Sequence, residues 1–300
     1  MLTLPAHTRY DYSAIETRRP YSWPGGKRLA FYVAINIEHF AFGQGLGHFL
    51  APETPPPDHR NYAWRDYGNR VGVWRMLELF DELKIPAHHL VNTAIYDHCP
   101  EVLEPIRARG DEIIGHGRTN AERAGLMWED DERRLLADVR DTIARHEGKP
   151  PRGWMAPWMS ASRITLDLLK ETGYDFVMDW PCDDQPFWMR TRAGPILSLP
   201  YPLEINDSPQ ILVRHHSATE FVSMMVDQFE EMLAQSERQP LVCGIALHAP
   251  VFGQPYRLRV LREAFRHILN HKDIARVWLT RPGAIFDHIN ALPRGIVPGS

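Results

Sequence analysis

Acidic or imidazole side chains stand at the ends of four short apolar runs of this sequence. Glu38 and His39 end the run LAFYVAINIEH, His116 ends DEIIGH, Asp179 ends YDFVMD and His248 ends PLVCGIALH. A carboxylate can take a proton from water, and an imidazole can accept or donate one near neutral pH. If these side chains meet in space, they can activate water and protonate a leaving group.

Between these residues, short apolar runs alternate with amphipathic stretches, which is typical of repeated βα units. The apolar runs predict strands at 29–38, 88–92, 111–117, 152–157, 174–180, 196–202, 240–248 and 275–280, with 211–216 as a further candidate. Helical spacing predicts helices at 73–83, 100–110, 128–148, 164–173, 219–233, 256–269 and 281–292. Ser217 and Glu220 form a capping box that should open the helix at 219–233.

We count about seven or eight strands, and this number of βα units favours a closed or nearly closed parallel barrel over an open sheet. No Ser/Gly-rich linker divides the chain. We therefore expect residues 1–300 to form a single domain, with 1–25 as an N-terminal extension.

The carboxyl ends of parallel strands in a barrel meet at one mouth, where active sites lie. The residues expected there are Asn36, Glu38, His39, His116, Trp154 to Pro157, Asp179 and His248. Taken singly, a histidine at a strand end is more often structural, and we assign His59, His88, His89, His98, His215, His216 and His271 to that class. Asp183 and Asp184 could equally solvate a loop or line a pocket.

Two predicted loops, 39–70 and 181–195, are longer than compact domains usually carry. Both contain several aromatic residues, which argues against disorder. We expect these loops to cover a pocket or to form a subunit interface.

Composition and charge bear on the expected partners and cellular location of the protein. The 300 residues have a net charge of −4 and no basic block, which disfavours nucleic acid as a partner. No apolar run approaches the ~20 residues that would span a membrane. The three cysteines are widely spaced, and no apolar segment follows a basic start at the N-terminus, so we expect a cytoplasmic protein without disulfides.

The motifs NIEHF (36–40), GHG-x-x-N (115–120), RGW-x-x-P (152–157), DW (179–180) and LH (247–248) occur in this order. In that order they resemble the polysaccharide deacetylase superfamily. The stretches RDYGNRVGVWR (65–75) and LHAPVFGQPYR (247–257) resemble its branch of metal-independent allantoinases, cyclic-imide hydrolases and peptidoglycan-deacetylase-like proteins. The resemblance covers about residues 22 to 290 and implies a distorted (β/α) barrel of about seven parallel strands.

The sequence departs from the metal-binding members of this superfamily, which use an Asp-Asp motif and an H-x-x-x-H pair. Asn120 stands where the second histidine would be, and an amide oxygen is a poor zinc ligand. We therefore expect no tightly held metal or other cofactor. If a zinc-like divalent metal binds, Glu38, His39, His116 and Asn120 are its expected ligands.

Hydrolysis of an amide-type carbon–nitrogen bond needs a base for water and an acid for the leaving nitrogen. We assign Glu38 as the base, Arg152 as the partner of its carboxylate, His116 as the group that positions water or carbonyl, and His248 as the acid. Asp179 is expected to orient His248. Asn36, His39, Asn120, Trp154, Pro157, Trp180, Asp183 and Asp184 are the expected substrate contacts.

The expected substrate is a small cyclic imide, ureide or amide, because a cytosolic enzyme would not meet a cell-wall polymer. An N-deacetylase of a sugar or peptidoglycan-type carbohydrate is the alternative, and a non-catalytic metabolite- or carbohydrate-binding protein is another. The resemblance also implies a homotetramer.

Overall fold

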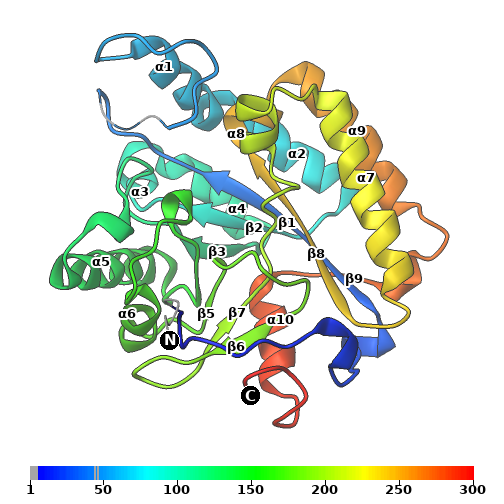
Figure 1. The fold of residues 1–300 in the computed structure, drawn as a ribbon. Coiled ribbons are helices and arrows are strands. Elements are labelled where there is room, and N and C mark those ends of the chain that lie inside the picture. The colour runs from blue at the N-terminus through cyan, green and yellow to red at the C-terminus, as the bar shows by residue number, and fades with distance from the viewer. Residues whose placement is uncertain (1–5, 44, 46) are drawn as a thin grey trace, which may run out of the picture.

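The structure is a computed structural model that describes residues 6–43, 45 and 47–300. Its centre is a curled, mostly parallel sheet wrapped by helices, as Figure 1 shows. The strands follow the order β6-β7-β5-β4-β3-β2-β1-β8, and β9 pairs with the first half of β1. Within the described residues every strand pairing is parallel except that of β6 with β7. This confirms the predicted barrel-type α/β class.

The strand bounds place the predicted apolar runs in the sheet. They are β1 Leu29–Ile37, β2 Ala87–Val91, β3 Glu112–Gly115, β4 Gly153–Trp154, β5 Phe176–Val177, β6 Phe187–Met189, β7 Ile196–Ser198, β8 Leu241–His248 and β9 Val277–Leu279. The α-helices are α1 His59–Tyr67, α2 Val73–Leu83, α3 Ile95–His98, α4 Leu103–Ala108, α5 Glu129–Glu147, α6 Thr165–Thr172, α7 Ala218–Gln235, α8 Ala249–Phe252, α9 Pro255–Leu269 and α10 Pro282–Asn290.

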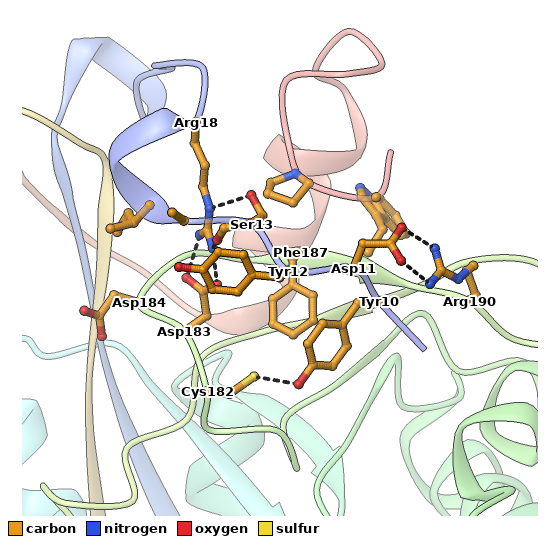
Figure 2. Close-up of a pocket in the computed structure, with 15 residues that line it drawn as sticks. Tyr10, Asp11, Tyr12, Ser13, Arg18, Cys182, Asp183, Asp184, Phe187 and Arg190 are labelled. Atoms are coloured by element: carbon orange, nitrogen blue, oxygen red, sulfur yellow. Dashed lines mark hydrogen bonds and ion pairs between the residues drawn. The ribbon is translucent and has the colours of Figure 1, made fainter. Parts of the chain in front are cut away.

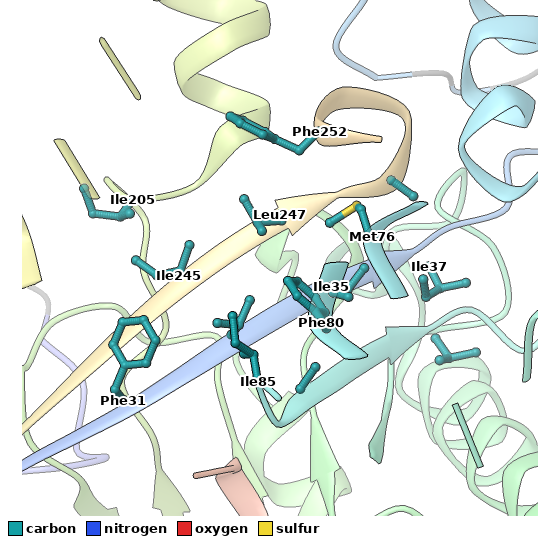
Figure 3. Close-up of a cluster of buried hydrophobic side chains, with 14 of the residues drawn as sticks. Phe31, Ile35, Ile37, Met76, Phe80, Ile85, Ile205, Ile245, Leu247 and Phe252 are labelled. Carbon is teal, nitrogen blue, oxygen red and sulfur yellow. The ribbon is translucent and has the colours of Figure 1, made fainter. Parts of the chain in front are cut away.

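Alternate residues of β1 face opposite sides of the sheet, as strand geometry requires. Phe31, Ile35 and Ile37 face outward and pack in the same buried cluster as Met76 and Phe80 of α2 (Figure 3). Ala30, Tyr32 and Ala34 face the interior of the curled sheet and belong to a second buried cluster. Both faces of β1 are therefore buried, which explains its nearly continuous apolar sequence.

The sheet curls until its ends approach, but β7 and β8 do not pair as strands. Backbone hydrogen bonds from irregular segments bridge them instead: Ala246 N donates to Ile205 O at 3.0 Å, and Val242 N donates to Asp184 O at 2.9 Å. The hydroxyl of Tyr32 on β1 donates to the Pro200 carbonyl inside this seam. The structure is thus a nearly closed barrel with one irregular seam.

Two predictions about strands are wrong. Residues 211–216 form no strand, because Ser208–Val213 is a short π-helix with Pro209 in its first turn, and Asn206 Oδ1 accepts a hydrogen bond of 3.1 Å from Ser208 N. The apolar run here, Ile211 to Val213, has only three residues and cannot distinguish a strand from a helix. The second error is the loop predicted at 181–195, which contains β6; with three residues, this edge strand is too short to show an alternating pattern.

The loop predicted at 39–70 also contains structure. It ends in α1, which leads through a π-helical turn, Gly68–Gly72, into α2. The segment lies over the carboxyl end of β1 (Figure 1). The prediction that this loop covers a pocket is therefore consistent with its position, and its role in a subunit interface stays a prediction.

None of the helices within the described residues has the length and apolar character that crossing a membrane would require.

The capping box predicted from Ser217 and Glu220 is present at the start of α7. Ser217 Oγ accepts from Glu220 N at 3.2 Å, and Glu220 Oε2 accepts from Ser217 N at 2.7 Å. We expect Ser217→Ala to lower the free energy of unfolding by about 1 kcal/mol, because the first turn of α7 loses a partner for an N–H group. Urea denaturation followed by circular dichroism would measure the change.

The matched control is Ser223→Ala, since Ser223 is exposed in the middle of the same helix. Alanine has the higher helix propensity there, so this variant should be as stable as the parent or slightly more so. Equal destabilisation by both substitutions would contradict a specific capping role for Ser217.

Candidate functional site

Glu38 follows the last residue of β1 and is the centre of a buried polar cluster at the carboxyl ends of the strands. Its carboxylate is largely buried, with 8% of the side chain exposed. Its backbone carbonyl accepts a hydrogen bond of 2.8 Å from Asn69 Nδ2, which ties the end of β1 to the turn before α2. The side chain can therefore point across the barrel mouth in a fixed direction.

His116 enters the cluster from the end of β3. Its Nδ1 lies 2.6 Å from the carbonyl oxygen of Met155, which can only accept a hydrogen bond. A proton must therefore be on Nδ1, so a ring that carries only this proton presents a lone pair at Nε2. That Nε2 lies 3.7 Å from Glu38 Oε1.

The residue after His116 must be glycine for the chain to turn here. Gly117 has a φ of +69°, and a Cβ at this position would lie 2.9 Å from the Pro157 ring. Pro157 follows β4, so this close contact joins the ends of β3 and β4. The GHG and RGW-x-x-P motifs are therefore in contact in the structure.

His248 is the last residue of β8 and approaches Glu38 from the other side. Its Nε2 lies 3.6 Å from Glu38 Oε1, and its Nδ1 lies 2.6 Å from Oδ1 of the fully buried Asp207. The backbone N–H of His248 donates to Asp207 Oδ2 at 2.9 Å. Asp207 thus fixes both the ring and the backbone of His248.

Two further side chains bind the Glu38 carboxylate. Asn120 Nδ2 donates to Oε1 at 2.8 Å, and Arg65 Nη1 lies 3.5 Å from Oε2. Arg65 comes from α1, and its Nη2 also donates to the His48 carbonyl at 2.7 Å. The covering segment is therefore tied directly to the carboxylate.

The environment moves the pKa values of Glu38 and His248 in opposite directions. Burial by itself would raise the pKa of Glu38, but the charge of His248, contacts with both imidazoles and the charge of Arg65 hold it well below its usual range. Burial would lower the pKa of His248, but Asp207 and Glu38 raise it to about 9. At neutral pH the cluster therefore contains a carboxylate and an imidazolium.

Asp179 lies after β5 and is buried beside the cluster. Its Oδ1 accepts from Ala156 N at 2.7 Å, one residue beyond the Met155 carbonyl that holds His116. Among the described residues, its Oδ2 has no hydrogen-bond partner. Burial raises the pKa of Asp179 to about 7, against the opposing effect of the Ala156 N–H.

The structure brings together Glu38, His116, His248 and Asn120, as the sequence predicts. Asn36 lies on β1, two residues before Glu38, and its Nδ2 donates to Tyr201 Oη at 3.3 Å.

Two predicted pairings are wrong. Arg152 precedes β4, at the end of the barrel away from Glu38, and binds Asp175 and Asp287 at 2.8 Å each. Arg65, and not Arg152, is the arginine that pairs with the Glu38 carboxylate. Asp179 does not orient His248, because Asp207 does.

Other predicted contacts lie outside the cluster. The ring of His39 stacks on His98, with 4.0 Å between centroids, and Trp154 is buried against Tyr174. Trp180 packs on Tyr10, Asp183 pairs with Arg18, and Asp184 lines cavities away from Glu38.

Sequence reasoning missed Arg65 and Asp207. Arg65 opens the stretch RDYGNRVGVWR that carries part of the resemblance, but it lies in the loop predicted at 39–70 and not at a strand end. Asp207 lies in an irregular segment between β7 and the π-helix, where no pattern distinguishes it from a loop acid. In the structure, their burial identifies them: Arg65 is 4% exposed and Asp207 is 0% exposed.

The residues present do not fit a tightly held metal. Asn120 presents its N–H, and not an oxygen, to Glu38 Oε1, while the His39 ring stacks on His98. Within the part of the chain that the structure describes, no three His, Cys, Asp or Glu side chains are arranged to hold a metal ion. The absence of a metal in the working protein stays a prediction.

Comparisons with known proteins find similarity to polysaccharide deacetylases. Residues 56–177 match the family model for polysaccharide deacetylase. The chain is 22% identical over 294 residues to the peptidoglycan deacetylase of Helicobacter pylori. This alignment covers 87% of this chain and 97% of that protein.

Two solved structures share the fold at 25% identity. The PuuE allantoinase superposes with a TM-score of 0.82 over 97% of this chain and 98% of its own. A probable polysaccharide deacetylase from Pseudomonas aeruginosa PAO1 gives a TM-score of 0.78, over 89% of this chain and 92% of its own.

The raised pKa of Asp179 predicts how stability depends on pH. A carboxyl with a higher pKa in the folded than in the unfolded state stabilises the fold at low pH, and this contribution is lost as the pH rises from about 4 to about 7. Asp179→Asn should remove that dependence, because the amide is neutral and its oxygen can still accept from Ala156 N.

We expect the difference in unfolding free energy between pH 5 and pH 8 to be smaller in Asp179→Asn than in the parent. Chemical denaturation at both pH values measures it. Asp175→Asn, a change at a partly buried ion pair, is the control and should keep the parent's pH dependence. An unchanged pH dependence in Asp179→Asn would show that this carboxyl titrates normally.

Proposed function

We propose that this chain, which resembles the polysaccharide deacetylase superfamily, hydrolyses an amide-type carbon–nitrogen bond of a small molecule. The observation that carries the proposal is the position of Glu38 Oε1, which lies 3.7 Å and 3.6 Å from Nε2 of two imidazoles. Each imidazole is fixed through its other nitrogen. Such an arrangement suits acid–base catalysis more than structural support, because it keeps reactive nitrogens directed at one point.

The first step activates water. A water molecule that donates one hydrogen to His116 Nε2 and the other to Glu38 Oε1 is oriented for attack. Because the pKa of Glu38 is held low, this carboxylate is a weak base, and we assign the proton to His116 Nε2 instead. This revises the role that the sequence suggested for Glu38, which here orients water and stabilises the imidazolium that forms.

The second step breaks the bond. The hydroxide portion of the water adds to the carbonyl carbon, and the tetrahedral intermediate expels nitrogen as His248 donates its Nε2 proton to it. His248 suits this role because its pKa is raised to about 9, so it is protonated at neutral pH. The excess proton on His116 can then return to His248 through Glu38 Oε1, which lies near both nitrogens.

A small substrate is favoured by the enclosure of the cluster. The Glu38, His116 and His248 side chains are at most 8% exposed, and a cavity that reaches Glu38 has a volume of only about 10 Å³. A cyclic imide or ureide requires a smaller opening of the covering segment than a polysaccharide chain. The similarity to the PuuE allantoinase over nearly the whole chain supports the same class.

Deacetylation of an N-acetylated carbohydrate is the second candidate. It is supported by the family model and by the relatives named as deacetylases. The same two steps would apply, with acetate as the acid product. A non-catalytic binding protein on this fold remains the third reading and predicts no turnover.

A substrate panel distinguishes these three functions. We propose to incubate the protein with allantoin, hydantoin, dihydrouracil, succinimide and chitotetraose. Ring opening releases a carboxylic acid without acetate and is followed by a pH-stat, whereas deacetylation releases acetate, which an enzymatic assay detects. We expect turnover of at least one cyclic substrate without acetate. Acetate release from chitotetraose alone would establish the second candidate.

Glu38→Gln should lower kcat by about 10²- to 10⁴-fold on the substrate so identified, because water loses its second acceptor. It should also move the alkaline fall in activity to lower pH. His248 must be protonated to act as the acid, and without the Glu38 charge its pKa drops from about 9 towards its ordinary value. A pH–rate profile of residual activity measures this shift.

Arg152→Gln is the matched control, because the structure removes this residue from the cluster. Its kcat should stay within about twofold of the parent, even if the protein is less stable. Loss of activity in a folded Arg152→Gln, or an unshifted alkaline limb in Glu38→Gln, would contradict the proposed roles.

A further inference from the structure

Asn120 binds Glu38 through one end of its amide and leaves the other end unused. The residue is 3% exposed, and its Nδ2 donates to Glu38 Oε1 at 2.8 Å. A carboxylate oxygen can only accept a hydrogen bond, so the nitrogen of the amide, and not its oxygen, must face Glu38. Among the described residues, the amide oxygen Oδ1 has no hydrogen-bond partner. A buried acceptor without a partner is costly, so a ligand that supplies an N–H group here gains binding energy.

Oδ1 of Asn120 lies close to the reacting atoms. The oxygen and nitrogen of one amide are about 2.3 Å apart, so Oδ1 lies within about 5 Å of Glu38 Oε1. In the proposed reaction, the attacking water is bound to the same Oε1. A substrate carbonyl that approaches this water can bring its nitrogen, which is one covalent bond from the carbonyl carbon, within reach of Oδ1.

The backbone of Asn120 is fixed on both sides. Its N–H donates to the His39 carbonyl at 2.8 Å, and its carbonyl accepts from Trp158 Nε1 at 2.7 Å. Trp158 reaches this carbonyl from a backbone with a φ of +61°, which bulky residues rarely adopt. Such strained positions are concentrated at ligand sites. Because the backbone and Nδ2 are both held, Oδ1 has little freedom to reach another partner within the protein.

A cavity beside the N-terminal extension lacks such an atom. It is lined by residues from the segments 10–18, 182–190 and 298–299 (Figure 2). Arg18 pairs there with Asp183, and Arg190 pairs with Asp11. Among the described residues that line this cavity, no buried polar side-chain atom is without a hydrogen-bond partner. A buried acceptor that is ready for a ligand is therefore a feature of the Glu38 cluster and not of this cavity.

We propose that Asn120 Oδ1 accepts a hydrogen bond from the N–H group of the amide that is hydrolysed. The inference rests on the proposed function and narrows its substrate class to amides, imides and ureides whose reacting nitrogen carries a hydrogen. A substrate with a fully substituted nitrogen would leave Oδ1 buried without a partner. Sites that hydrogen-bond a substrate N–H group discriminate strongly against an analogue that lacks it.

Succinimide and N-methylsuccinimide test the proposal, because they differ only in the group on the ring nitrogen. At pH 7 the parent should hydrolyse succinimide with a kcat/KM at least about tenfold higher. Asn120→Leu removes the acceptor but keeps the volume of the side chain, so the two kcat/KM values should come to within about twofold of each other. A preference that came from the bulk of the methyl group would persist in Asn120→Leu, and that result would overturn the proposal.

Asn120→Asp is the conservative variant, since its carboxyl keeps an oxygen in place of Oδ1. Its kcat should fall, because a second carboxyl replaces the N–H donor beside Glu38, but the preference for succinimide should remain. Loss of the preference in this variant would contradict the role of Oδ1. Asn290→Leu, the same substitution at an exposed residue of α10, is the matched control and should keep both the activity and the preference of the parent.

Calorimetry separates this inference from the proposed function and needs no variant, so it also decides if Asn120→Leu fails to fold. The probes 2-pyrrolidinone and γ-butyrolactone have nearly the same shape, but only the first has an N–H group. The full chain should bind 2-pyrrolidinone at least about tenfold more tightly. Similar affinities for both probes, or binding of neither, would overturn the inference. Absence of turnover on every substrate of the panel would overturn only the proposed function.

Discussion

The arrangement of the candidate site depends on one buried carboxylate. An ionised side chain that loses its water is costly unless charged or hydrogen-bonding partners replace the lost hydration. Glu38 obtains these partners from four separate parts of the chain: the ends of β3 and β8, the loop that carries Asn120, and α1. The strand order must therefore bring these segments together before the carboxylate can be buried in its charged form.

The partners are in turn held by groups further out, and this determines what each can do. His116 is fixed by a neutral carbonyl, so its ring is free to change charge without losing that hydrogen bond. His248 is fixed by a buried carboxylate, which favours the charged ring. Two chemically identical side chains thus receive different roles from the groups at their Nδ1 atoms. In the proposed reaction, this difference lets one histidine act as the acid and the other as the base.

Sequence alone predicts the part of this site that regular strands position. Glu38, His116 and His248 follow apolar runs, and parallel strands end at a common rim, so their meeting could be expected. Arg65 and Asp207 could not be found in this way, because α1 and the segment before the π-helix lie in connections whose paths depend on tertiary contacts. The error over Arg152 has the same origin: the sequence indicates a suitable charge near a strand, but not that it precedes the strand and faces the opposite end of the barrel.

Asp179 and Asp207 differ in the groups that oppose the effect of burial on their pKa values. Both are buried side chains near the same rim, and burial raises the pKa of each. Asp207 has a histidine charge beside it, which opposes that rise and lets it act as an anion towards His248. Asp179 has one backbone N–H group, and its second oxygen has no hydrogen-bond partner among the described residues. A carboxyl with a pKa of about 7 changes charge near neutral pH, and it does so next to the backbone segment whose Met155 carbonyl holds His116.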